Sequence, residues 1–103
     1  MKTRDCCLTL MLPKSLEEMI VGHLLDHPEW VLGFSTTDVS GHGAAGVVHS
    51  AGELVRGATR RVRVQIVMNR EDAAALIAGL RATLTNPEVA YWLTPVLEFG
   101  RFE

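Results

Sequence analysis

The residues best suited to chemistry gather around a glycine-rich stretch in the middle of the chain. His42 and His49 lie within it, seven residues apart. Neutral imidazole is a good ligand for zinc, copper or nickel, so this pair is a candidate metal site, and such a transition-metal ion is the candidate cofactor. A protein metal site needs three or four ligands, however, so two histidines alone are a weak signal. Two solvated loop histidines remain the plainer interpretation.

Four arginines follow these histidines at the end of the glycine-rich stretch: Arg56, Arg60, Arg61 and Arg63. Their guanidinium groups can hold a phosphate or the carboxylates of a partner. An ordinary solvated surface is an equal alternative. An ion pair between subunits, with acidic residues from earlier in the chain, is a third.

The other histidines and the cysteines favour structural roles. His23 and His27 have the i, i+4 spacing of a helical metal face, but they border an apolar stripe and His27 falls in the last turn. Cys6 and Cys7 are neighbours on an expected strand, so their side chains point to opposite faces and cannot chelate one ion together. The chain has no nucleophile elbow, Walker loop or Rossmann glycine fingerprint. We therefore expect a protein that is not an enzyme.

Composition excludes several classes of protein. At 103 residues the chain is one domain, residues 1–103, and its formal net charge of −2 argues against a nucleic-acid binder. The longest apolar runs are shorter than a membrane-spanning helix requires, so we expect no direct membrane insertion. The basic start is followed by an alternating run and then by Pro13 and Lys14, which is not a signal-peptide pattern. We expect a cytoplasmic protein.

The pattern of apolar residues predicts six elements that position these side chains. Period-two alternation indicates strands over residues 6–12, 33–40, 61–68 and 88–97. A first helix is expected to start at Ser15, where Ser15 and Glu18 have capping-box spacing, and to end before His27-Pro28. A second helix is expected to be capped by Asn69 and to end before Asn86-Pro87. The order β-α-β-β-α-β is the split β-α-β pattern. We predict an α+β fold, a ferredoxin-like sandwich.

A long loop, residues 41–59, joins the second and third predicted strands. It carries five of the nine glycines, which raise the entropy cost of ordering it. Compact domains rarely keep such a long connection without a use. We expect a lid, a partner-binding arm or a ligand-gated switch; the alternative is a plain hairpin tip.

Two stretches resemble a known family. LLDHPEWVLGFSTTDVSGHG, at Leu24 to Gly43, and YWLTPVLEFGRF, at Tyr91 to Phe102, are similar to an uncharacterised PII-like family encoded beside heavy-metal efflux pumps of the resistance-nodulation-division type. That family is related to the PII signalling proteins and CutA. The resemblance covers nearly the whole chain. It implies a cytoplasmic homotrimer, a sensor or regulator acting on the efflux system.

The resemblance also implies a place for a ligand. In PII-like proteins small ligands lie in clefts between subunits, at the base of the long loop. The matching ligand-binding residues here are Ser40, Gly41, His42, Gly43, Arg60 and Arg61. The chain departs from true PII proteins after the second helix, where Thr85-Asn86-Pro87 replaces their glycine-rich nucleotide loop. This departure argues against adenine-nucleotide binding.

Three functional hypotheses follow. The first is a trimeric, non-enzymatic regulator whose loop changes order when a metal ion or small molecule binds, with an inner-membrane cation efflux pump as partner. The second is a metal buffer or delivery protein that uses His42 and His49 from neighbouring subunits. The third is a nucleotide sensor that uses the arginines.

Overall fold

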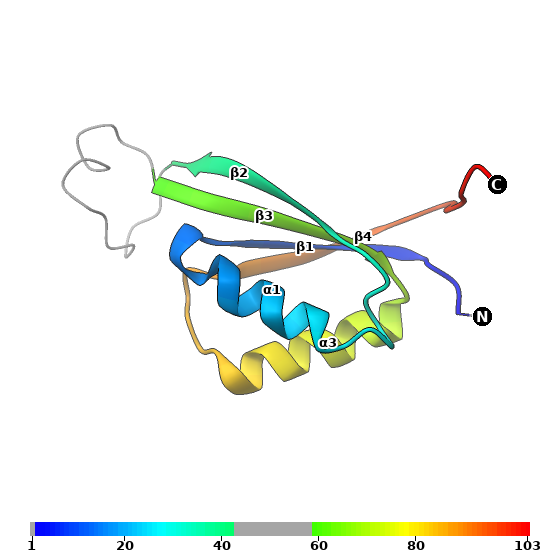
Figure 1. Cartoon of the computed structure of the whole chain (residues 1–103), viewed down its shortest axis with the longest axis horizontal. Coiled ribbons are helices and arrows are strands. Elements are labelled where there is room, and N and C mark those ends of the chain that lie inside the picture. Colours follow the sequence, from blue (N-terminus) through cyan, green and yellow to red (C-terminus); the bar gives the residue numbers. More distant parts are fainter. Residues whose placement is uncertain (1, 43–58) are drawn as a thin grey trace.

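A four-stranded antiparallel sheet with two α-helices on one side forms the body of the molecule (Figure 1). The computed structural model describes residues 2–42 and 59–103. The elements are β1 (Cys6–Pro13), the 3-10 helix η1 (Lys14–Leu16), α1 (Glu17–Leu25), β2 (Ser35–Gly41), β3 (Thr59–Met68), α3 (Arg70–Thr83) and β4 (Ala90–Pro95). This order confirms the predicted ferredoxin-like sandwich.

The strands lie in the order β2-β3-β1-β4, so β1 and β3 are central and β2 and β4 form the edges. Register places Leu10 of β1 opposite Val64 of β3 and Tyr91 of β4. On the other side of β3, Ser40 of β2 lies opposite Arg60. The pairing therefore brings the two ends of the 43–58 connection together at one end of the sheet.

The core fills the space between the sheet and the helices. Alternate residues of β1 and β3 point into it, each at most 3% exposed: Cys6, Leu8, Leu10, Leu12, Val62, Val64, Ile66 and Met68. They meet Ile20 and Leu24 of α1, and Ala73, Leu76 and Leu80 of α3. Burial of a side chain of this size stabilises the fold by roughly 1.5 to 3 kcal/mol.

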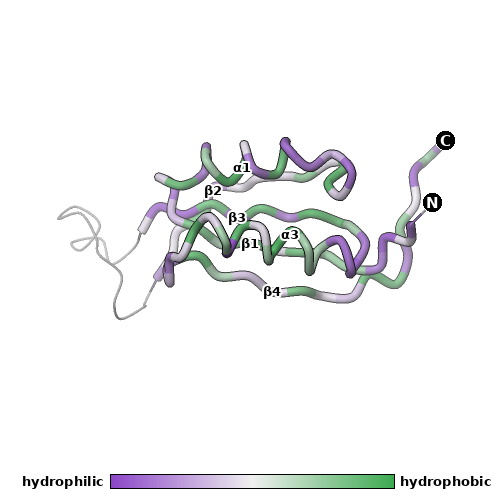
Figure 2. The backbone as a smooth tube through the Cα atoms, turned by 90° about the horizontal axis from the view of Figure 1, so that it is seen from below, coloured by the Kyte–Doolittle hydropathy of each residue, from purple (hydrophilic) through white to green (hydrophobic). Residues whose placement is uncertain are grey.

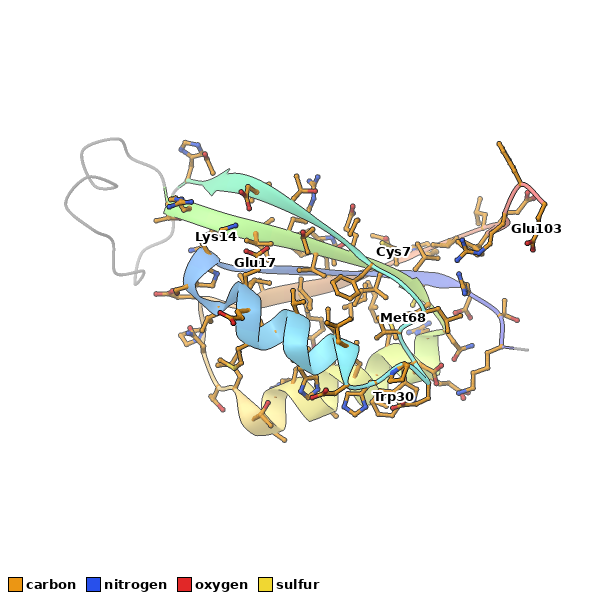
Figure 3. All side chains as sticks on the ribbon, in the orientation of Figure 1. Cys7, Lys14, Glu17, Trp30, Met68 and Glu103 are labelled. Carbon is orange, nitrogen blue, oxygen red and sulfur yellow. The ribbon has the colours of Figure 1, made fainter. Side chains whose placement is uncertain are left out.

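Both described α-helices lie on one side of the sheet, so neither α1 nor α3 covers the opposite face. Cys7, Thr9 and Met11 of β1 point to this open face, beside Arg63 and Gln65 of β3. Thr9 is nevertheless only 2% exposed, because larger side chains on the neighbouring strands surround it. Cys6 and Cys7 lie on opposite faces, as the sequence predicts; the labelled side chains of Cys7 and Met68 lie on these two sides in Figure 3.

Edge strand β4 is uncovered on both faces. Tyr91, Trp92 and Leu93 are 45%, 43% and 37% exposed, although each is large and mostly apolar. Figure 2 shows β4 lying outside both helices when the molecule is seen from the helix side. Tyr91 and Leu93 point to the helix side of the sheet and Trp92 to the open face, so exposed apolar side chains lie on both sides of this edge.

The start of the first helix differs from the prediction. No capping box forms at Ser15, because this residue lies in the short 3-10 helix η1. α1 follows directly, and its N-cap residue, Leu16, makes no side-chain hydrogen bond. The tight turn out of β1 is held by an ion pair between Lys14 and Glu17 instead. Leu25, the last residue of α1, is 65% exposed and lies outside the core. The cap of the second helix is confirmed, since Asn69 Oδ1 accepts a hydrogen bond from the Glu71 amide at 3.0 Å.

β2 and β4 each begin two residues later than the alternation predicts. β2 begins at Ser35 because the chain still turns after α1, where the Val31 amide donates to the His27 carbonyl at 2.9 Å. β4 begins at Ala90 because a turn at Asn86 holds the Val89 amide. Among the described helices, none has the length and apolar character that crossing a membrane requires.

Candidate functional site

A charged hollow lies where β2 and β3 meet the 43–58 connection. Its volume is about 200 Å³ and its lining, here called the corner site, comprises Lys14, Asp38, Val39, Ser40, Arg60 and Arg61. Strand pairing assembles it, because Val39 lies opposite Arg61 and Ser40 opposite Arg60. Lys14 joins them from the end of β1, since Pro13 is the register partner of Arg61.

The charges of the corner site are mixed but mainly positive. Lys14 Nζ lies 2.8 Å from Asp38 Oδ1 and 2.8 Å from Glu17 Oε1. The hydrogen bond from Lys14 holds the pKa of Asp38 below its usual range. The bonds to Asp38 and Glu17 in turn raise the pKa of Lys14. With Arg60 and Arg61 also cationic, the lining has three positive side chains and one negative, and Glu17 adds a second carboxylate beside Lys14.

Arg61 is held in place by two hydrogen bonds. Its Nε donates to Thr59 Oγ1 at 3.1 Å, and one terminal nitrogen donates to the Glu88 carbonyl at 3.1 Å. The second bond ties the corner to the connection between α3 and β4. A guanidinium fixed in this way loses little side-chain entropy when an anion binds.

Gly41 makes room for this arginine. A Cβ atom at position 41 would lie 2.5 Å from Arg61 Nε and 2.8 Å from Thr59 Oγ1, too close for either to stay. The Thr59 hydroxyl also donates to the Gly41 carbonyl at 3.4 Å. Gly41 is predicted as a ligand-site residue by the family resemblance, but nothing in the sequence indicates that it accommodates the Arg61 side chain.

The structure brings together only some of the predicted site residues. Ser40, Arg60 and Arg61 line the corner site, and His42 follows β2 as the last described residue before the connection. Gly43 and His49 lie outside the described residues. Lys14 and Asp38 were not predicted as site residues. The one feature of the sequence that could have pointed to Lys14 is its position directly after the first predicted strand.

The predicted metal site at His42 and His49 stays a prediction. Across residues 2–42 and 59–103, no three or more His, Cys, Asp or Glu side chains gather closely enough to hold a metal ion. A site built on His42 therefore needs ligands from residues 43–58 or from another copy of the chain.

His23 of α1 and His27, which lies two residues beyond the end of that helix and not in its last turn, have structural contacts. The ring of His27 stacks on Trp30 with 4.6 Å between centroids, and the His23 ring lies 5.0 Å from that of His27. His27 Nδ1 lies 2.8 Å from Glu29 Oε1, and this hydrogen bond lowers the pKa of Glu29. These contacts support the structural interpretation of the pair.

A larger hollow of about 510 Å³ lies between the helices and the uncovered edge of the sheet. We call it the apolar hollow, because most of its lining is hydrophobic: Leu10, Ile20, Ile77, Leu80, Leu84, Pro87, Val89 and Tyr91. Arg81, Thr85 and Asn86 complete the lining. It holds no cluster of acids, bases or nucleophiles, so despite its size it is not suited to chemistry.

Comparisons with known proteins place the chain in a family and a fold. A family model described as "Protein of unknown function (DUF3240)" matches residues 2–103. The search of curated proteins found no significant match. A crystal structure of a DUF3240 family protein from Shewanella baltica is similar at a TM-score of 0.76 and 20% identity, covering 98% of this chain and 99% of that one.

Two PII-like structures share the fold. The first is a nitrogen regulatory PII-like protein from Thiomonas intermedia, bound to ADP, AMP and bicarbonate, with TM-score 0.70, 17% identity and 96% of each chain covered. The second is a putative PII-like signalling protein from Thermus thermophilus, with TM-score 0.64, 16% identity and 89% and 86% of the two chains covered. The PII-like fold expected from the resemblance is therefore confirmed.

Proposed function

We propose that this chain, which belongs to the DUF3240 family, is a non-enzymatic PII-like regulator that senses a small anion at the corner site. The observation that carries the proposal is the convergence of Lys14, Arg60 and Arg61 on one hollow. Lysine and arginine are the residues with which proteins bind phosphate and carboxylate groups. Because the hollow lies where β2 and β3 enter the 43–58 connection, bound ligand acts directly on both ends of that connection.

The nature of the ligand follows from charge and size. The Thiomonas intermedia protein of this fold is bound to ADP, AMP and bicarbonate, and all three are anions. A hollow of about 200 Å³ suits a single phosphate or bicarbonate group better than a whole nucleotide. The short Thr85-Asn86-Pro87 connection, where true PII proteins have a glycine-rich nucleotide loop, favours the same ligand class.

The working form in this proposal is a homotrimer. Support comes from the face of the sheet that α1 and α3 leave open and from edge strand β4, whose large apolar residues Tyr91, Trp92 and Leu93 are all exposed. The partner is a heavy-metal efflux pump of the resistance-nodulation-division type, contacted through the 43–58 connection. The resemblance of Leu24–Gly43 and Tyr91–Phe102 to the family encoded beside such pumps supports this choice.

Titration calorimetry with orthophosphate, bicarbonate and ADP tests the anion proposal. We expect at least one to bind, and the Arg60→Ala and Arg61→Ala variants to lose about tenfold or more in affinity, since a charge-assisted hydrogen bond is worth roughly 1.5 kcal/mol or more. Arg70→Ala is the matched control, because Arg70 is an exposed arginine at the start of α3. Absence of binding by all three anions, or equal affinity in Arg61→Ala, contradicts the proposal.

Direct metal binding is the second candidate function. It is favoured by the position of His42 beside the corner site, because three copies around an axis supply three such imidazoles. Zinc, copper or nickel then binds to the trimer, and the His42→Ala, His49→Ala double variant loses that binding. Metal affinity unchanged by the double variant removes this candidate.

A further inference from the structure

Residues 96–103 form an extended arm that leaves the sheet beyond β4. Figures 1 and 3 show the arm projecting from the body, with Glu103 at its tip. Its only backbone tie to the sheet region within the described residues is the Val96 amide, which donates to the Asp5 carbonyl at 3.0 Å. Leu97 is 100% exposed and Phe102 is also fully exposed. Two large apolar side chains thus stand in water on a segment that buries neither.

The base of the arm is fixed by Phe99. The guanidinium of Arg4 lies 4.4 Å from the centre of the Phe99 ring, and that of Arg101 lies 5.6 Å from it. Both distances are within the range of cation–π attraction. The arm therefore leaves the body in a set direction, and Phe102 is held away from its own core.

The apolar hollow offers a matching surface elsewhere on the molecule. Ile20 at its floor is 1% exposed, and the half-buried Ile77, Leu84 and Val89 open onto the space. At the rim stands Arg81, for which the described part of the chain provides no hydrogen bond or ion pair. The hollow thus combines an apolar interior with one unpaired cation.

The arm has the complementary composition. Its sequence is VLEFGRFE, in which Glu103 follows Phe102 directly. A phenyl ring fits a space of about 510 Å³, and burying it there removes apolar surface from water, which favours docking. The Glu103 carboxylate then has a cationic partner in Arg81.

The arm points away from the hollow of its own chain. The hollow adjoins the connection between α3 and β4, at the start of β4, whereas the arm leaves from the end of β4 (Figure 1). The six residues of β4 separate the two by about 20 Å. A docked arm that keeps its direction therefore comes from another molecule.

We propose that the arm of one copy docks into the apolar hollow of a second copy, with Phe102 inside the hollow and Glu103 paired with Arg81. Self-association is part of the proposed function, and this inference rests on that part. It adds that residues 96–103 of each subunit bind to the neighbouring subunit on the side of the sheet that carries the helices. The contact is distinct from the open face of the sheet and from the corner site.

Isotope-filtered NMR on a one-to-one mixture of labelled and unlabelled protein tests the contact directly. We expect intermolecular nuclear Overhauser effects between the Phe102 ring and the methyl groups of Ile77 and Leu84. A trimer without these signals overturns the docking inference and leaves the proposed function standing. A monomer overturns both the inference and the proposed trimer.

A charge exchange tests the pairing at the rim. Arg81→Glu and Glu103→Arg should each weaken assembly about fivefold or more, measured by light scattering over a dilution series, because each places like charges together. The double variant should recover most of the loss. Glu71→Arg, an exposed reversal at the start of α3, is the control and should leave assembly unchanged. Single variants that assemble like the parent, or a double variant that recovers nothing, contradict the pairing.

Discussion

The corner site and the apolar hollow are two recesses of one small fold with opposite chemistry. The corner site is less than half as large, about 200 Å³ against 510 Å³, yet its lining includes Lys14, Asp38, Arg60 and Arg61. The lining of the larger hollow includes a single charged residue, Arg81. The proposed anion site is therefore chosen by the chemistry of its lining and not by its size.

The two recesses arise from different features of the fold. The corner site forms because strand pairing carries β2, β3 and the end of β1 to one point, where residues distant in sequence become neighbours. The apolar hollow forms because two helices cannot cover four strands, which leaves the inner side of β4 open. The first arrangement suits a small anion, and the second suits a protein segment.

An alanine at the floor of the apolar hollow should cause the largest difference between the two recesses, because it should lower stability without changing anion affinity. Ile20→Ala removes a side chain that is 1% exposed and should lower the free energy of unfolding by about 3 kcal/mol. Urea denaturation measures this loss. The anion affinity of the folded variant should stay within twofold of the parent. A large change in affinity would show that the two recesses are coupled.

A smaller effect, confined to the corner site, is expected from Gly41→Ala. The new Cβ would lie 2.5 Å from Arg61 Nε, so the guanidinium must move and anion affinity should fall about tenfold. Gly33→Ala is the matched control, because nothing lies within 4 Å of the position its Cβ would take. Titration calorimetry with phosphate measures the affinity of both variants. Equal affinities would mean that the position of Arg61 is not important for binding.

Removing the acid from the corner site should improve binding. Asp38→Asn abolishes a negative charge beside Arg60 and leaves Lys14 paired with Glu17 alone, so anion affinity should rise about threefold. The gain should shrink as salt is raised, because these charges are exposed. A decrease in affinity would indicate that Asp38 helps to position the ligand.

The smallest expected effect is that of pH on anion affinity, which should stay constant across the neutral range. The pKa of Asp38 is lowered and that of Lys14 is raised, so their ion pair is present across the neutral range. Its contribution to stability disappears only in acid, as the pH falls through the depressed pKa of Asp38, or in strong alkali, as it rises through the elevated pKa of Lys14. Affinity for a permanently charged phosphate diester should therefore not vary with the state of this ion pair between about pH 5 and 9. A slope in that range would reveal a titrating group outside the pair.

Most of the fold could be predicted from the sequence, because alternation and capping are local signals. The alternation of Val62, Val64 and Ile66 marks β3, and Asn69 marks the start of α3, as the structure confirms. Failures came where tertiary structure outweighs local pattern. The turn out of β1 begins with a 3-10 helix instead of the capping box predicted at Ser15.

The corner site could be predicted only in part. Arg60 and Arg61 were found because they cluster in sequence, and Ser40 because of the family resemblance. Lys14 and Asp38 were missed because their proximity depends on the register between strands, which no local pattern encodes. The space that Gly41 leaves for Arg61 likewise follows from pairing across the sheet.

The central claim is that an anion binds at the corner site, and backbone amide shifts recorded during a phosphate titration test it most directly. The account predicts saturable shifts centred on Lys14, Ser40, Arg60 and Arg61, with the amides of Ile77 and Leu84 unmoved. Shifts centred on the apolar hollow, or none at saturating phosphate, would contradict it.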